Sequence, residues 1–256
     1  MSNTEKTIIK DDEQIDDLIL GGLHLIQSRE GYRFSLDAVL LSFFPELVEV
    51  RKVVDLGTGN GVIPLLLSVR SPHVKIYGVE IQDSMVDRAK RTISYNKLQN
   101  RIEIMQGDIR EIEKTICPQR ADLVISNPPF WKKGQGKINT NSERAIARHE
   151  LRVEMPEIVK AAAYSLKPEG SFCLIHRANR LPEIIAAFSR NRLAVNRLRM
   201  VHSHINREAK MILIEGKKAG KKGLRILPPL IIYEKTGEYS SELRQIYRFG
   251  VNGDEY

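Results

Sequence analysis

The sequence is poor in the residues that build disulfide frameworks and metal sites. Its 256 residues contain two cysteines, Cys117 and Cys173, with no CxxC pair and no histidine at ligand spacing. This scarcity excludes a disulfide-stapled scaffold and argues against a structural zinc ion. We therefore expect no metal site and a reducing compartment.

The sequence also lacks the long apolar runs that enter membranes. No window approaches the roughly 18 uninterrupted apolar residues of a membrane span. The first twenty residues carry six acidic side chains, where a secretory signal would have a basic stretch followed by an apolar run. We expect a cytoplasmic protein outside the membrane, and no pattern indicates an obligate protein partner.

Acidic residues are scarce in one part of the chain. Residues 177–225 contain thirteen Lys and Arg against three Glu, a net charge of +10, whereas the remaining residues sum to −2. Basicity confined to one stretch favours a surface that faces a polyanion, although Lys and Arg also protect strand edges from aggregation. Within this stretch, GKKAGKKG at 216–223 is expected to be a mobile basic loop that includes Lys217 and Lys218.

Internal repeats and Ser/Gly/Pro-rich linkers are missing as well, so we expect one domain with appendages. Residues 1–50 are interpreted as an N-terminal lid or wall that ends in a helix, with Ser35 as its N-cap. Residues 51–225 form the main domain, and residues 226–256 form a peripheral extension.

From Lys52 onward, short β-branched runs alternate with helical patterns. This alternation predicts an α/β fold, a Rossmann-like doubly wound and mostly parallel seven-stranded sheet with an antiparallel edge strand. The edge follows from two final apolar stretches that no helical pattern separates. The expected strands lie in 52–57, 75–81, 102–109, 122–130, 171–177, 193–201 and 210–216, and the expected helices near 63–69, 84–98, 155–166 and 181–189.

In an open parallel sheet, ligands bind beyond the carboxyl ends of the strands. The first such end is DLGTGNG at 55–61, where glycines permit a tight turn and a close backbone approach to a ligand. Such turns also occur only to pack a helix on a strand. The pattern is GxGxG and not GxGxxG, and Asp55 places negative charge beside the turn. A nicotinamide dinucleotide is therefore the secondary interpretation.

Two further strand ends carry carboxylates. Glu80 closes KIYGVE and can accept two hydrogen bonds from a ribose diol. In Gly107-Asp108-Ile109, the carboxylate can accept from the exocyclic amine of an adenine while Ile109 packs against the ring. Each is more often structural when it stands alone, and their spacing after Asp55 favours a shared site.

The fourth strand end, Asn127-Pro128-Pro129-Phe130, is the most specific. Its two prolines fix the backbone and remove two donors. If the Asn127 side-chain oxygen and the Pro128 carbonyl accept from a planar amine, they aim its lone pair at an electrophile while Phe130 stacks on it. A strand stopper needs only one proline.

In this order, DLGTGNG, VE, GD and NPPF resemble the S-adenosylmethionine-dependent methyltransferases that methylate amines, over roughly residues 50 to 175. The cofactor of that family carries its own electrophile, so the protein contributes positioning and electrostatics. The resemblance implies S-adenosylmethionine held at its methionine end by Asp55, Gly57 and Gly59, at its ribose by Glu80 with Ile81 beside it, and at its adenine by Asp108 and Ile109, with the substrate amine at Asn127, Pro128 and Phe130.

The whole chain is most similar to bacterial tRNA adenine-N6 methyltransferases that modify the adenosine next to the anticodon of valine tRNA. YRFSLDAVLL at 32–41, NPPF and ARHE at 147–150 carry this similarity. It implies a tRNA partner whose target base is extracted into the pocket. The segment after NPPF adds basic residues suited to phosphates around that base, namely Lys132, Lys133, Arg144 and Arg148.

Three alternatives stay open at this point. Guanine-N2 methyltransferases of ribosomal RNA also use NPPF, usually with a duplicated half for which this chain has no room. Protein glutamine-N5 methyltransferases typically carry NPPY and a long helical N-terminal domain. A catalytically silent RNA-binding module would keep the basic stretch and lose the cofactor ligands, all of which are present.

Overall fold

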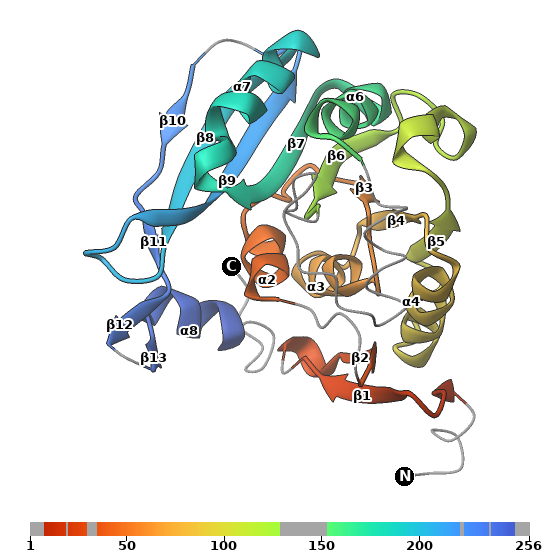
Figure 1. Cartoon of the computed structure of the whole chain (residues 1–256). Helices are drawn as coiled ribbons and strands as arrows, with labels where there is room; N and C mark the ends of the chain where they lie inside the picture. The colour runs from red at the N-terminus through yellow and green to blue at the C-terminus, as the bar shows by residue number, and fades with distance from the viewer. Residues whose placement is uncertain are drawn as a thin grey trace, which may run out of the picture.

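The computed structural model describes residues 8–18, 20–29, 35–128, 153–220, 223–235 and 237–248. A central sheet, nine-stranded in these residues, has the order β10-β8-β9-β7-β6-β3-β4-β5, and β11 also pairs with β8 (Figure 1). Its strands are β3 (Lys52–Leu56), β4 (Lys75–Glu80), β5 (Ile102–Gln106), β6 (Ala121–Ser126), β7 (Leu166–Arg177), β8 (Leu193–His202), β9 (Ala209–Lys218), β10 (Arg225–Ile226) and β11 (Leu230–Ile231).

The doubly wound α/β architecture is confirmed. Strands β5, β4, β3, β6 and β7 are mutually parallel, whereas β9 is antiparallel to both β7 and β8. The antiparallel strand therefore lies inside the sheet and not at its edge. The crossover after β7 places β8 one strand position away from β7, and β9 fills the position between them. Two short strands, β10 and β11, then extend the edge beyond the seven expected strands.

Helices cover both faces of the sheet (Figure 1). The buried faces of α2 (Leu36–Phe43), α3 (Val62–Arg70) and α4 (Asp83–Tyr95) pack on one side. The 3₁₀ helix η2 (Ile109–Lys114), α6 (Met155–Ser165) and α7 (Leu181–Arg190) pack on the other. Helix α4 shows why the prediction succeeds, because its buried Val86, Ala89 and Ile93 recur at helical spacing.

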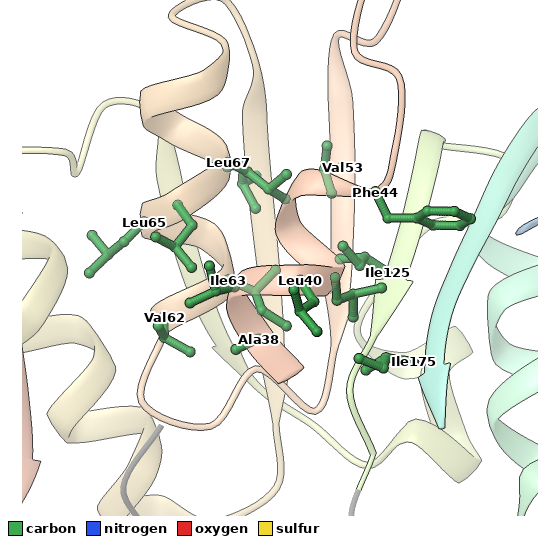
Figure 2. Close-up of a cluster of buried hydrophobic side chains, with 14 of the residues drawn as sticks. Ala38, Leu40, Phe44, Val53, Val62, Ile63, Leu65, Leu67, Ile125 and Ile175 are labelled. Carbon is green, nitrogen blue, oxygen red and sulfur yellow. The ribbon is translucent and has the colours of Figure 1, made fainter. Parts of the chain in front are cut away.

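Strand β7 divides the interior into two cores. Ile175 faces the core beneath α2 and α3, where it joins Leu40 and Ile125 (Figure 2). Phe172 points to the opposite core and stacks on Phe188 of α7, with ring centroids 5.3 Å apart. Side chains of a strand alternate between faces, so a strand covered on both sides is apolar at successive positions.

The N-terminal segment contains a hairpin that the sequence did not predict, formed by β1 (Glu13–Asp17) and β2 (His24–Ser28). Glu13 is 1% exposed and accepts hydrogen bonds from Arg88 (3.0 Å) and Arg91 (2.6 Å) of α4. Although burial acts in the opposite direction, hydrogen bonds led by that of Arg91 lower the pKa of Glu13 to about 2. This hairpin is therefore docked on the main domain.

The expected helix of the N-terminal segment is α2. It begins after Ser35, although the Ser35 side chain makes no capping hydrogen bond. The segment also contributes Leu18, Leu20 and Leu25 to the core that α2 and α3 share. The described part of residues 1–50 is thus built into the main domain.

The C-terminal extension packs on the same core. It contains β12 (Tyr233–Lys235), β13 (Glu238–Tyr239) and α8 (Ser241–Arg248). Leu243 and Ile246 of α8 are buried, and Glu242 pairs with Arg199 of β8 at 2.6 Å. Among the described residues, no helix is both long and apolar enough to cross a membrane.

Candidate cofactor and substrate site

The turn after β3 is held against the end of β4. The backbone N–H groups of Gly57 and Thr58 both donate to the carbonyl of Val79, at 2.9 and 3.0 Å. Gly57 and Gly59 have φ angles of 76° and 57°, a region that favours glycine. A Cβ on Gly59 would meet no atom within 4 Å, so the backbone is open on that side.

Glu80 joins this turn to the loop that follows β4. It is 3% exposed, and one carboxylate oxygen accepts from the N–H of Gly59 at 2.9 Å. The other accepts from the N–H groups of Ile81 and Gln82, at 2.9 and 3.0 Å. Three of about four acceptor positions are thus used, so a ribose diol must share or displace one of these donors.

Asp55 lies one strand away and has no such partners. Its side chain is fully buried, and neither carboxylate oxygen has a hydrogen-bond partner. Burial raises the pKa of Asp55 to about 7. The nearby Thr58 hydroxyl, although outside hydrogen-bond geometry, opposes this rise, and the Glu80 carboxylate adds to it. A buried carboxylate without donors is costly, and a nearby cation stabilises it. The end of β3 therefore suits a cationic group such as an ammonium.

The ends of β3, β4 and β5 line one pocket, whose roughly 230 Å³ of empty space includes open solvent. Of the predicted cofactor residues, Asp55 and Gly59 are not in its lining, whereas the lining contains Gly57, Glu80, Ile81, Asp108 and Ile109. Val79, Gly107 and Val153 complete the lining. Val153 lies just before α6, far along the chain, and a single valine carries no sequence signal that identifies it.

Asp108 has a partner that the sequence analysis missed. It caps η2 by accepting from the backbone N–H of Arg110 at 2.8 Å, and the Arg110 Nε lies 2.9 Å from both carboxylate oxygens. The Arg110 guanidinium lowers the pKa of Asp108. An adenine amine must therefore share this carboxylate with Arg110. The D-x-R spacing could have indicated this pair.

The end of β6 lies beside the end of β3, because the Ser126 hydroxyl donates to the Leu56 carbonyl at 2.8 Å. Asn127 follows half-buried, and Pro128 is buried. These two residues are the described part of the predicted substrate motif. The other predicted substrate and RNA contacts on this segment lie outside the described residues, namely Phe130, Lys132, Lys133, Arg144 and Arg148.

Lys217 and Lys218 are not brought to this pocket. They end β9, where Lys217 pairs with Ser171, the first residue of β7 that pairs with β9. The Lys218 amine donates to the Leu166 carbonyl at 2.7 Å, and burial lowers its pKa. This is the amino end of the parallel strands, opposite the pocket. The expected basic loop is also shorter than predicted, because residues 216–218 belong to β9.

Comparisons with known proteins show which sequences the chain resembles. The methyltransferase small domain profile matches residues 36–197. The chain is 34% identical over 193 residues to a tRNA1(Val) (adenine(37)-N6)-methyltransferase of Porphyromonas gingivalis, covering 74% of this chain and 75% of that protein. It is 30% identical over 184 residues to the protein of the same name in Phocaeicola vulgatus, covering 71% and 75%.

The solved structures support the fold. A predicted O-methyltransferase from Agrobacterium tumefaciens aligns with a TM-score of 0.67 at 19% identity, covering 86% of this chain and 97% of that one. The family match spans the turn after β3, the carboxylates of β4 and β5 and the end of β6.

Proposed function

The chain belongs to the methyltransferase small domain family, and from this premise we propose that it methylates N6 of an adenine next to the anticodon of a tRNA, with S-adenosylmethionine as methyl donor. The observation that carries the proposal is the single pocket that joins the ends of β3, β4 and β5 beside the end of β6. Relatives named as tRNA adenine methyltransferases are 30–34% identical over 71–74% of this chain.

Each part of the pocket has a task that its chemistry supports. Asp55 is buried two residues before the lining residue Gly57 and does not itself line the pocket, so the ammonium of the methionine part would stabilise its carboxylate only by reaching past that turn. Glu80 lines the pocket and would accept from the ribose hydroxyls. Asp108 accepts from the adenine amine, and Ile109 packs against the ring. When bound, the cofactor supplies a methyl group on a sulfonium, which is the electrophile of the reaction.

The end of β6 orients the nucleophile. The exocyclic amine of adenine is a poor nucleophile because its lone pair is delocalised into the ring. The side-chain oxygen of Asn127 and the carbonyl of Pro128 accept from this amine and favour the geometry for attack, while Phe130 stacks on the base. The proton leaves to water after transfer, so the reaction needs no general base at this position.

A labelling experiment tests this function. Incubate the protein with labelled S-adenosylmethionine and total RNA from a strain that lacks the gene, then identify the labelled nucleoside by mass spectrometry. We expect N6-methyladenosine in tRNA and labelling that is slower by about 100-fold or more with Asn127→Ala. Label in N2-methylguanosine, or in protein glutamine, would overturn the proposed substrate.

A further inference from the structure

The turn that joins β8 to β9, residues 203–208, lies at the same end of the sheet as the pocket. Because β9 is antiparallel to both neighbours, β7 and β8 run in the same direction, and their carboxyl ends lie together. Arg177 ends β7 and pairs with Met211, so Lys210 is its near neighbour. From β6 to β8 there are three strand intervals, about 14 Å at ~4.8 Å each.

This end carries positive charge that the fold does not use. Arg177, Arg207 and Lys210 are all exposed, and none forms an ion pair in the described part of the chain. Glu208 is the one acidic residue between β8 and Lys210. Ile205, at the tip of the turn, is 76% exposed. Exposed cations beside an apolar tip suit RNA, where phosphates alternate with unstacked bases.

The C-terminal extension holds this turn in place. The backbone N–H of Tyr233 donates to the carbonyl of Ser203 at 2.9 Å. The rings of His204, Tyr233, Tyr239 and Tyr247 then form a ladder, with successive centroids 5.5, 5.4 and 5.7 Å apart. Figure 1 shows the turn beside β12, β13 and α8. A turn fixed in advance loses less conformational entropy when it binds.

We propose that residues 203–208, together with Arg177 and Lys210, form a tRNA-contacting surface that binds backbone phosphates beside the methylated base, and that the aromatic ladder braces it. This inference rests on the proposed function, since it assigns the RNA part of that same site. It gives the extension a role, and it places the RNA contacts of the basic stretch at the pocket end of the sheet.

Two matched double variants test the surface. Arg207→Ala/Lys210→Ala removes two charges from it, and Lys160→Ala/Arg190→Ala removes two exposed charges from α6 and α7. Near physiological salt, the first pair should raise the KM for tRNA about tenfold and flatten the log–log salt slope by about 1.4, the value for two phosphates of a single strand. The second pair should leave the slope unchanged. The proposed tRNA-contacting surface would be contradicted if both double variants changed the KM and the salt slope equally, or if neither changed them.

A third pair of variants tests the brace. Tyr233→Ala should raise the KM for tRNA, and Tyr233→Phe should restore it because the ring stack is retained. An unchanged KM in a folded Tyr233→Ala protein would refute the brace. Filter binding of tRNA and calorimetry with the cofactor separate this outcome from failure of the proposed function. If the wild-type protein binds both ligands and transfers no methyl group to tRNA, the function is wrong, whereas the surface is still judged by the binding slopes.

Discussion

The two ends of the central sheet use charge in opposite ways. At the amino end, Asp122 accepts from the backbone N–H groups of Arg51 and Lys52, at 3.0 and 2.8 Å, and from the Lys167 amine at 2.7 Å. Lys218 is likewise bound to a backbone carbonyl. These side chains are thus bound to partners within the fold.

At the carboxyl end, several charges have no protein partner. Asp55 is buried without a hydrogen bond, and Arg177, Arg207 and Lys210 form no ion pair in the described residues. Glu80 is the intermediate case, because it is hydrogen-bonded to backbone and still lines the pocket. The comparison teaches that a buried carboxylate without donors, more than exposed charge, marks the functional end of this sheet.

The largest expected effect is at the end of β6. Asn127→Ala removes a preorganised acceptor at the reacting amine, so it should lower single-turnover methyl transfer by about 100-fold or more. Cofactor affinity should stay nearly constant, since Asn127 is not among the residues that line the cofactor pocket. Rapid-quench measurements on tRNA-saturated protein check this. A wild-type rate in Asn127→Ala would show that Asn127 does not take part in methyl transfer.

Glu80 and Asp122 form a matched pair across the comparison, because each is a carboxylate with three donors. Glu80→Ala should weaken S-adenosylmethionine binding by about 1.5–3 kcal/mol, the range for hydrogen bonds to a charged group. Asp122→Ala should lower the free energy of unfolding and leave cofactor affinity unchanged. Calorimetric titration and urea unfolding separate the two. Equal losses of cofactor affinity in the two variants would contradict the assignment of cofactor binding to the carboxyl end alone.

The pH dependence of cofactor binding tests the unpartnered carboxylate. The pKa of Asp55 is raised to about 7, so the ionised form that attracts an ammonium is lost as pH falls below 7. We expect cofactor affinity to rise between about pH 6 and 8 and to level off above, and Asp55→Asn to remove this dependence. Calorimetry at several pH values measures it.

Asp55 also makes the stability of the cofactor-free protein depend on pH. This dependence has the opposite sign to that of cofactor affinity. Between about pH 4 and 7, native Asp55 holds a proton that the unfolded chain has released, so its contribution to stability falls as pH rises through this window. Thermal unfolding of wild type and Asp55→Asn without cofactor should therefore diverge across it. Parallel curves would mean that Asp55 has an ordinary pKa.

The smallest effect is expected at the amino end. Lys217→Ala/Lys218→Ala should leave the salt slope of tRNA binding unchanged, because these side chains end β9 on the side away from the pocket. Loss of the Lys218 hydrogen bond should cost about 1 kcal/mol of stability. Filter binding between low and physiological salt checks the slope. A slope flattened by about 1.4 would show that tRNA reaches both ends.

Local periodicity was sufficient to predict the main elements of the sheet and its helices. It failed for β1, because EQIDD has one apolar residue and reads as solvent-exposed. Glu13 is buried only because Arg88 and Arg91, more than seventy positions later, neutralise it. A pattern within a few residues carries no information about such a distant partner.

The pocket was predictable because its residues end consecutive strands, and topology alone brings those ends together. The contribution of Val153 was not predictable, because this residue reaches the pocket from a segment that follows β6. Composition also could not predict which basic residues of 177–225 lie at which end of the sheet. Arg177 and Lys218 count equally in that sum, and only the antiparallel direction of β9 sends them to opposite ends of the sheet.

The position of β9 inside the sheet also orders events during synthesis. Strand β7 ends at Arg177, and the partner that covers its free edge is complete only at Lys218. At about 5–20 residues per second, a growing chain presents that unpaired edge for roughly 2–8 s. An exposed strand edge can pair with other chains. A ribosome pause between β7 and β9 should therefore promote aggregation more than a pause before β7.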